Sequence, residues 1–280
     1  MKCEILKIMN NNVIWVLDAK NKAETVLIGK GIGFGVKPGQ QVEIPQDAID
    51  KVFITYDQKT MKDYIALAES IDSNIMEVCT EIIIYAEEKL GKLSHRVYPV
   101  LTDHIAFAIE RLKSQMVIQN PFLMEIKGIY QDEFEIGLRA QSMILKKIGI
   151  DITEDEVGFI ALHLNAAREN KEVKEIMKNT RLIKTVIDNI EAALDYKVDM
   201  DSFTYQRLVS HIKGSIERAR LGQTIKNPLL ESIKVEFANS YGIAAKIRTT
   251  VERELSIKIS DDEVGYMAIH IARISNKAEL

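Results

Sequence analysis

The second half of this chain repeats the first, and four of its five histidines mark the repeat. The interval from His104 to His211 is the same as the interval from His163 to His270, and this interval is called the repeat offset below. When residues 104–163 are laid on 211–270 without a gap, about a third of the positions are identical, which is typical of a duplicated unit. The chain is therefore expected to contain two copies of one domain, each with two histidines in equivalent positions.

Apolar residues recur with a helical period from about residue 62 onward. Around His104 they predict a continuous buried stripe with the histidine at its edge. The stripe comprises Val97, Val100, Leu101, Ile105, Ala108, Ile109 and Leu112. The helix of His163 is predicted to begin with the capping box Thr153-x-x-Glu156, which recurs at the repeat offset as Ser260-x-x-Glu263. At about 100° per residue, His163 lies off the apolar face of this helix, on the side of Glu156.

The first 55 or so residues predict a small antiparallel β module instead. Two short apolar runs, 13–17 and 25–28, are separated by turn residues, and a glycine-rich segment follows at 29–35. A module of this size buries little apolar surface, so we expect it to dimerise.

The fold class is therefore a multidomain chain: a small antiparallel all-β N-terminal domain followed by two homologous all-α helical bundles. We expect the domains at 1–58, 65–170 and 171–280, with the two bundles joined at the charged segment 169–178.

Composition narrows the possible partners and compartment. The net charge is −4, but residues 1–56 carry seven lysines and six acidic residues, so a polyanion is expected to bind at the β module if it binds anywhere. No segment approaches the ~18 apolar residues of a membrane helix, and the N-terminus has no signal-peptide core. Cys3 and Cys79 lack metal-binding or redox spacing, which favours a reducing cytoplasm.

Several motifs follow one another in the order and spacing of a known family. The β module contains Lys7-x-x-Asn10-Asn11-Asn12 and Gly29-Lys30-Gly31-x-x-Phe34. The first copy contains Leu101-Thr102-Asp103-His104, Asn120-Pro121 and Asp155-Glu156-x-Gly158-Phe159-Ile160-Ala161-Leu162-His163. The second contains Arg207-Leu208-Val209-Ser210-His211 and Asp262-Glu263-x-Gly265-x-x-x-Ile269-His270. Over essentially its whole length the chain resembles the BglG/SacY-type transcriptional antiterminators of bacteria, and among them most closely the glucose-responsive branch.

This resemblance implies an RNA-binding β module that acts as a dimer on a leader-RNA hairpin and prevents formation of a terminator. The RNA-binding residues it implies are Lys7, Asn10, Asn11, Asn12, Gly29, Lys30, Gly31 and Phe34. Their chemistry is suitable: amides read base edges, an exposed ring stacks on an unpaired base, and lysines meet phosphates. From composition alone the same residues also fit an ordinary turn, a bulged glycine loop and a core phenylalanine.

The resemblance also implies that His104, His163, His211 and His270 accept phosphate from the sugar phosphotransferase system (PTS). The donors would be the phosphocarrier protein HPr and the sugar-specific permease, and each transfer would alter the packing of a homodimer. Neutral imidazole is nucleophilic near neutral pH, and a phosphoryl group adds roughly two negative charges. The neighbours of these sites are Asp103, Arg111 and Arg218. Each arginine is expected on the same face of its helix as the histidine. There it could contact a phosphoryl group or form a surface ion pair.

Other interpretations remain open at this point. One alternative is that each histidine pair binds a metal ion. The sequence has neither a Cys/His cluster nor a HExxH motif to support this, and we expect no cofactor. A DNA-binding activator is the alternative function, but it needs a helix-turn-helix where residues 1–55 show β patterning. An enzyme is the least favoured class, because the sequence shows no arrangement of a nucleophile with a general base. His95 has no counterpart in the second copy and is expected at the surface, while Trp15 is expected in the core.

Overall fold

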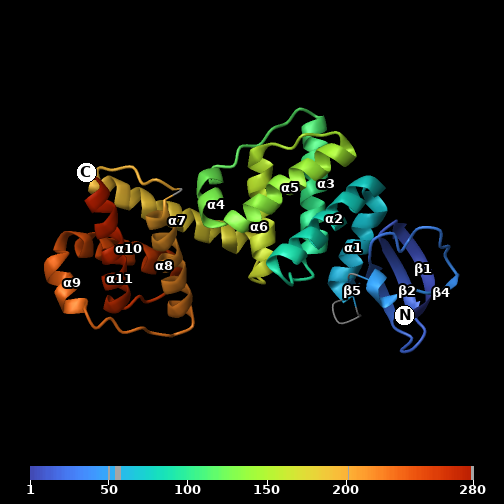
Figure 1. Ribbon diagram of the computed structural model, residues 1–280, viewed down its shortest axis with the longest axis horizontal. Helices are drawn as coiled ribbons and strands as arrows, with labels where there is room; N and C mark the ends of the chain where they lie inside the picture. Colours follow the sequence, from blue (N-terminus) through green and yellow to red (C-terminus); the bar gives the residue numbers. More distant parts are fainter. Residues whose placement is uncertain (50, 54–57, 201, 279–280) are drawn as a thin grey trace. The chain divides into compact units, whose positions relative to one another are not determined.

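The structure is a computed structural model that describes residues 1–49, 51–53, 58–200 and 202–278. It divides into two compact units, one of Met1–Pro121 with Tyr130–Val173 and one of Phe122–Ile129 with Lys174–Leu280 (Figure 1). The expected domain boundaries at 58, 65, 170 and 171 remain predictions. Residues 279 and 280, the end of the third expected domain, lie outside the described residues, as do 50, 54–57 and 201.

The N-terminal part of the first unit is a five-stranded antiparallel sheet in the order β4-β1-β2-β3-β5. Its strands are β1 (Lys2–Asn10), β2 (Val13–Asp18), β3 (Glu24–Ile28), β4 (Gln41–Glu43) and β5 (Lys51–Phe53), with a 3-10 turn at Gln46–Ala48. The two apolar runs predicted as strands are β2 and β3. The side chains of Ile5, Ile14, Val16 and Leu27 are fully buried and form the centre of the small core.

The rest of the first unit is helical, as predicted. It contains α1 (Gln58–Ser70), α2 (Ser73–Leu90), α3 (Val97–Lys113), α5 (Gln131–Ile148) and α6 (Glu154–Arg168). Helix α3 buries Leu101, Ile105 and Ile109, but Val100 is 45% exposed and Leu112 is half-buried, so the predicted stripe is too wide at both residues.

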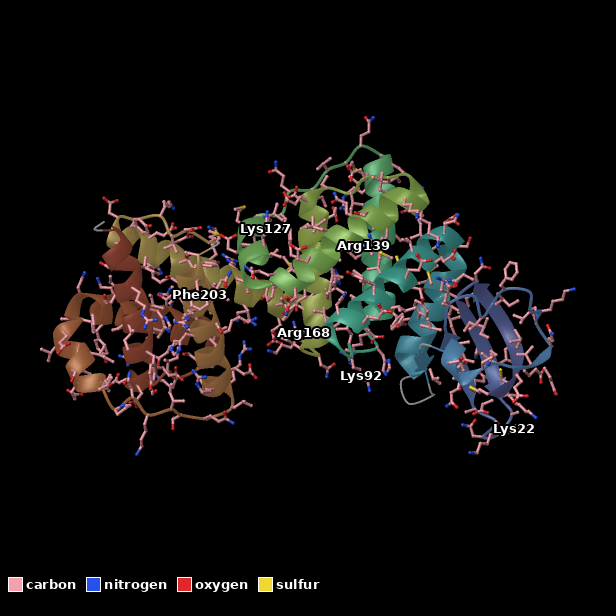
Figure 2. All side chains as sticks on the ribbon, viewed as in Figure 1. Lys22, Lys92, Lys127, Arg139, Arg168 and Phe203 are labelled. Carbon is pink, nitrogen blue, oxygen red and sulfur yellow. The ribbon has the colours of Figure 1, made fainter. Side chains whose placement is uncertain are left out.

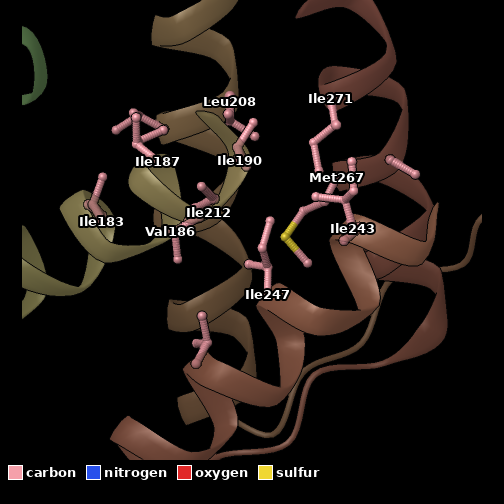
Figure 3. Packing of buried hydrophobic residues seen from close by; sticks show 14 of the residues in the cluster. Ile183, Val186, Ile187, Ile190, Leu208, Ile212, Ile243, Ile247, Met267 and Ile271 are labelled. Atoms are coloured by element: carbon pink, nitrogen blue, oxygen red, sulfur yellow. The ribbon is translucent and has the colours of Figure 1, made fainter. Parts of the chain in front are cut away.

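The second unit is also all-helical. It contains α4 (Leu123–Ile129), α7 (Val173–Leu194), α8 (Phe203–Arg220), α9 (Leu230–Glu236), α10 (Ala238–Leu255) and α11 (Asp261–Ala278). Figure 3 shows its core, where Val186 and Ile190 of α7 meet Ile212 of α8, Ile247 of α10 and Met267 of α11. None of the helices in the described ranges has the length and apolar character needed to cross a membrane.

The connection between the two copies is shorter than predicted. The charged segment 169–178 is expected to link them, but α7 begins at Val173, so the last part of that segment, 173–178, is helical. Ile176 is buried near the start of α7. One buried apolar residue among charged ones is enough to hold this turn of helix against the core, so the charge density did not predict that 173–178 is helical.

Candidate nucleic-acid interface and histidine sites

Two loops lie together at one end of the β sheet. Val13, at the start of β2, pairs with Ile28, at the end of β3, so the turn before Val13 and the segment after Ile28 share this end. The backbone N–H of Gly31 donates to the Asn12 side-chain oxygen at 2.8 Å. The N–H of Gly33 donates to the Asn11 carbonyl at 2.9 Å. These bonds hold the two loops of the predicted RNA site as one surface.

Asn10 and Asn12 form the frame of this surface. Both are buried, and the Asn12 N–H donates to the Asn10 side-chain oxygen at 2.8 Å. A Cβ at Gly33 would lie 2.3 Å from the Asn10 carbonyl oxygen, so only glycine permits this close approach. Gly31 has a φ of +73°, which also favours glycine. The sequence did not distinguish these framing residues from contact residues, because turn asparagines and glycines serve both purposes.

The exposed side chains of the predicted RNA site are those of Asn11, Lys30 and Phe34. The Phe34 side chain is 80% exposed, whereas apolar side chains of the sheet lie in its core. An aromatic ring in this position is available for stacking, and the interpretation of Phe34 as a core residue is excluded. Lys7 is half-buried on β1, and Trp15 is half-buried rather than in the core.

The first histidine pair lies between α3 and α6. The rings of His104 and His163 stack with centroids 4.7 Å apart and an angle of 30° between their planes. His104 Nε2 faces Glu156 Oε2 at 3.3 Å, and the other oxygen of Glu156 accepts a hydrogen bond from Arg111. Phe159 approaches His104 edge-on, with ring centroids 5.9 Å apart. The predicted placement of His163 on the side of Glu156 therefore brings both residues to His104.

Burial sets the protonation of His163. It is the main reason why the pKa of His163 falls to about 3, and the neighbouring His104 lowers it further. Burial alone would raise the pKa of Glu156, but the contacts with His104 and Arg111 lower it. At neutral pH Glu156 is therefore a carboxylate and His163 is a neutral imidazole, the nucleophilic form.

The second histidine pair repeats this arrangement between α8 and α11. The His211 and His270 rings are 5.4 Å apart and tilted by 38°, and Tyr266 takes the place of Phe159. His211 Nε2 faces Glu263 Oε2 at 3.2 Å. Arg218 donates two hydrogen bonds to Glu263, from Nε at 2.6 Å and from Nη2 at 2.9 Å.

A serine joins the second site. The Ser215 hydroxyl donates to Glu263 Oε2 at 2.6 Å and lies 3.3 Å from His211 Nε2. The equivalent residue of the first copy is Ala108. Burial lowers the pKa of His211, although Glu263 opposes the shift. Burial also lowers the pKa of His270, to about 4, with further contributions from the charges of His211, Arg273 and Arg207.

The two glutamates have a second role that the sequence did not reveal. Their backbone N–H groups do face the cap residues, at 3.4 Å from the Thr153 and Ser260 hydroxyl oxygens. Their side chains instead bind the arginine and the histidine of α3 in the first copy and of α8 in the second. A signal was present: the glutamate and the arginine both recur at the repeat offset.

The other residues named around the histidines differ in their contacts and exposure. Asp103, expected beside the first phosphosite, is exposed on α3, and the carboxylate that faces His104 is Glu156. Arg111 and Arg218 are paired with the buried glutamates rather than exposed. His95, expected at the surface, is half-buried, and its Nδ1 is enclosed. Within the described ranges, no group of three or more His, Cys, Asp or Glu side chains is arranged to hold a metal ion.

The two histidines of a pair present different nitrogens. A carboxylate only accepts hydrogen bonds, so the Nε2 of His104 and His211 that faces it carries a proton. In His163 and His270 the Nδ1 atom is buried, which leaves Nε2 as the candidate nucleophile. Each pair thus holds one imidazole oriented by a carboxylate and one neutral imidazole stacked against it.

Comparison with known proteins agrees with both parts of the chain. Residues 3–62 match the model of the CAT RNA binding domain, and residues 80–167 and 184–274 each match that of the PRD domain. The transcription antiterminator LicT of Bacillus subtilis (strain 168) is 36% identical over 279 residues, covering 98% of this chain and 100% of LicT. The GlcA/glcB genes antiterminator of Staphylococcus carnosus (strain TM300) is 34% identical over 280 residues, covering 98% and 96% of the two chains.

A solved structure supports the same assignment. The crystal structure of GlcT CAT-PRDI aligns with 60% of this chain and 98% of its own, with a TM-score of 0.53 and 36% sequence identity. The fold and the matches define a regulatory RNA-binding protein, not an enzyme, with one CAT domain and two PRD domains. The chain belongs to the BglG family of transcription antiterminators.

Proposed function

We propose that this antiterminator binds a hairpin in a leader RNA as a homodimer, through its CAT domain, and thereby prevents a terminator from forming. The observation that carries the proposal is the exposed Phe34 beside Lys30 and Asn11, on loops that Asn10 and Asn12 tie together from inside. RNA loops are recognised through stacking of unpaired bases on such rings and through amide contacts. Asn10, Asn12, Gly29 and Gly31 act in this proposal by shaping the surface, and Lys7 lies on the adjoining strand.

The RNA site is tested by binding of the full chain to its leader hairpin. Phe34→Ala is expected to weaken binding by about 1–3 kcal/mol, because one base loses its stacking partner. Lys30→Ala should weaken binding and reduce its salt dependence, because a phosphate contact is removed. Lys20→Ala is the matched control, since this exposed lysine lies in the turn at the other end of β2. Equal affinities for all three variants and the wild type would remove the assigned site, and tighter binding to duplex DNA of the same sequence would favour a DNA-binding activator.

Antitermination itself is tested by transcription in vitro through the leader template. Addition of the protein is expected to increase the fraction of full-length transcript, because the bound hairpin and the terminator exclude each other. Unchanged read-through on a template whose RNA the protein binds would contradict the mechanism. Sedimentation of the complex tests the dimer: one hairpin per two chains is the expected ratio.

We further propose that the four histidines accept phosphate from the PTS. Permease-dependent phosphorylation of His104 and His163 would silence the protein when the sugar is absent, and HPr-dependent phosphorylation of His211 and His270 would support activity. The low pKa values of His163 and His270 support this proposal, because they keep both rings neutral and nucleophilic at physiological pH. The sugar in this proposal is glucose or another PTS sugar, and the relatives include a protein named as a beta-glucoside operon antiterminator. The free, buried Cys3 and Cys79 suit a cytoplasmic protein.

The acceptor assignment is tested with purified donors. Acid-labile phosphate should appear on the wild type and disappear when all four histidines are replaced, whereas His95→Ala should leave the labelling unchanged. Label that persists in the fourfold variant would contradict the assignment.

A further inference from the structure

The second histidine pair has arginines on the side facing away from Glu263. Helices α8 and α11 run antiparallel, because Arg218 meets Glu263 while His211, seven positions earlier, meets His270, seven positions later. One further turn in the same direction leads to Arg207 on α8 and to Arg273 on α11. The pair thus has a carboxylate network at one end, and an arginine stands on each helix one turn beyond the other end.

Arg207 is held at this position by an aromatic side chain. Its guanidinium carbon lies 4.2 Å from the ring centroid of Phe203, which is 65% exposed and labelled in Figure 2. Stacking of this kind orients the guanidinium plane and leaves its N–H groups available. Arg273 is exposed, and neither arginine forms an ion pair in the part of the chain that the structure describes. The charges of both arginines lower the pKa of His270.

The first pair differs at the equivalent positions. Val100 stands where the second copy has Arg207, and Ala166 stands where it has Arg273. Val100 is 45% exposed, so the first copy has an apolar side chain at the surface one turn from His104, where the second copy has an arginine. The two copies therefore share the carboxylate end of the site and differ at the other end, where a phosphoryl group would add charge.

We propose that Arg207 and Arg273 form a phosphoryl-binding cradle, so that the second pair retains a phosphoryl group more strongly than the first. This inference rests on the proposed acceptor role of the histidines. In the transfer, the Nε2 lone pair of neutral His270 forms a bond to phosphorus while the P–N bond to the donor's histidine breaks. The donor ring leaves as neutral imidazole, and each ring keeps its own proton on the other nitrogen. The arginines act on the product by donating charge-assisted hydrogen bonds to the phosphoryl oxygens.

The experiment measures the equilibrium of phosphoryl transfer between phosphorylated HPr and the full chain. The background carries His104→Ala and His163→Ala, so that only the second pair is labelled. Loss of both guanidinium groups, in Arg207→Ala with Arg273→Ala, is expected to lower the equilibrium constant about tenfold. The double change to lysine should recover part of the loss, since an ammonium keeps the charge without the planar fork. The control variant carries Arg139→Ala, at a residue labelled in Figure 2, together with Arg253→Ala; it removes two arginines elsewhere and should change nothing.

A reciprocal variant and an independent readout complete the test. Val100→Arg, in a chain whose second pair is replaced by alanine, should raise the equilibrium constant of the first pair several-fold. An NMR titration should show that the His270 pKa rises when both arginines are removed. A transfer equilibrium or a His270 pKa unchanged in the arginine double variant overturns the cradle.

If the wild type accepts no phosphate from HPr, the acceptor role fails, and the cradle is judged separately with inorganic phosphate. A His270 resonance that moves on phosphate addition in the wild type, but not in the arginine double variant, supports the cradle. A resonance that moves in neither protein overturns it.

Discussion

The two histidine sites use the same three residue types but differ in how much water reaches them. In the first site the side chains of Glu156 and Arg111 are 1% and 8% exposed, and the histidine rings stack at 4.7 Å. In the second site Arg218 is 29% exposed, the rings are 5.4 Å apart, and Ser215 adds a hydroxyl. Duplication has thus kept the His–Glu–Arg set while changing its solvation. Because charge interactions strengthen as water is excluded, equal substitutions in the two copies should have unequal effects.

The largest difference is expected for loss of the glutamate. Glu156→Ala leaves the Arg111 guanidinium buried without its partner, which should destabilise the first unit by about 3–5 kcal/mol. Glu263→Ala should cost roughly half as much, because water reaches Arg218. Denaturant unfolding followed by hydrogen exchange on α3, α6, α8 and α11 separates the two effects. Glu135→Ala, an exposed carboxylate on α5, is the control, and equal costs at Glu156 and Glu263 would contradict the comparison.

The pH dependence of stability should also distinguish the copies. The folded pKa of His163 is about 3 and that of His270 about 4, both below the usual 6.5, so their contributions are complete above pH 6.5. As the pH falls below 6.5 the unfolded chain binds protons first, and stability decreases by up to roughly 1.4 kcal/mol per pH unit for a histidine that stays neutral in the folded chain. The loss continues to about pH 3 for His163 and ends near pH 4 for His270.

This dependence is measured by unfolding between pH 6.5 and 4.5, above the range in which Glu156 and Glu263 are protonated. His163→Gln should flatten the slope slightly more than His270→Gln, because the folded pKa of His163 lies further below the pH range of the measurement. A steeper slope in either variant would have the wrong sign for a histidine that is buried in its neutral form.

The spacing of the helix pairs gives the third prediction. A Cβ at Gly137 on α5 would lie 2.9 Å from the carbonyl oxygen of Val157 on α6, whereas the second copy carries the fully buried Ala244 at the equivalent position. Gly137→Ala should therefore cost about 1–3 kcal/mol through overpacking. Gly242→Ala is the matched control in a helix: nothing lies within 4 Å of its Cβ position, so this change should stabilise by about 0.5–1 kcal/mol. Thermal unfolding that shows both changes stabilising would mean that α5 and α6 lie farther apart.

The smallest expected effect concerns the serine. Ser215→Ala removes the hydrogen bond to Glu263 and should cost about 1–2 kcal/mol. Ala108→Ser places a hydroxyl at the equivalent level of the first site, where Glu156 Oε2 has no hydrogen bond of regular geometry among the described residues. That change should be neutral or slightly stabilising. A destabilisation by Ala108→Ser as large as that of Ser215→Ala would show that the two sites do not share one geometry.

Much of this architecture could be predicted from the sequence, because duplication preserves periodicity. The repeat offset and the repeated capping boxes predicted two helical copies with paired histidines, and α6 and α11 begin directly after Thr153 and Ser260. The prediction was wrong where a helical face extends beyond its neighbours. Val100 has the same spacing as its buried companions, and its exposure depends on tertiary packing.

The roles of individual polar residues were harder to predict. Nothing in the pattern Asn10-Asn11-Asn12 shows that the outer two are buried and the middle one is exposed. Glu156 fits a capping box, so its second role in binding Arg111 and His104 needed the position of α3. A local sequence pattern predicts the backbone conformation of its own segment, whereas these contacts join helices that lie far apart in the sequence.

The central claim is that phosphorylation of the first pair controls antitermination, and transcription in vitro tests it most directly. Read-through of the leader template is measured with the full chain before and after phosphorylation by the permease, and with His104→Ala and His163→Ala in one chain. We predict that phosphorylation lowers the read-through of the wild type and leaves that of the double variant unchanged. An equal decrease in both proteins, with RNA affinity intact beforehand, would contradict the account.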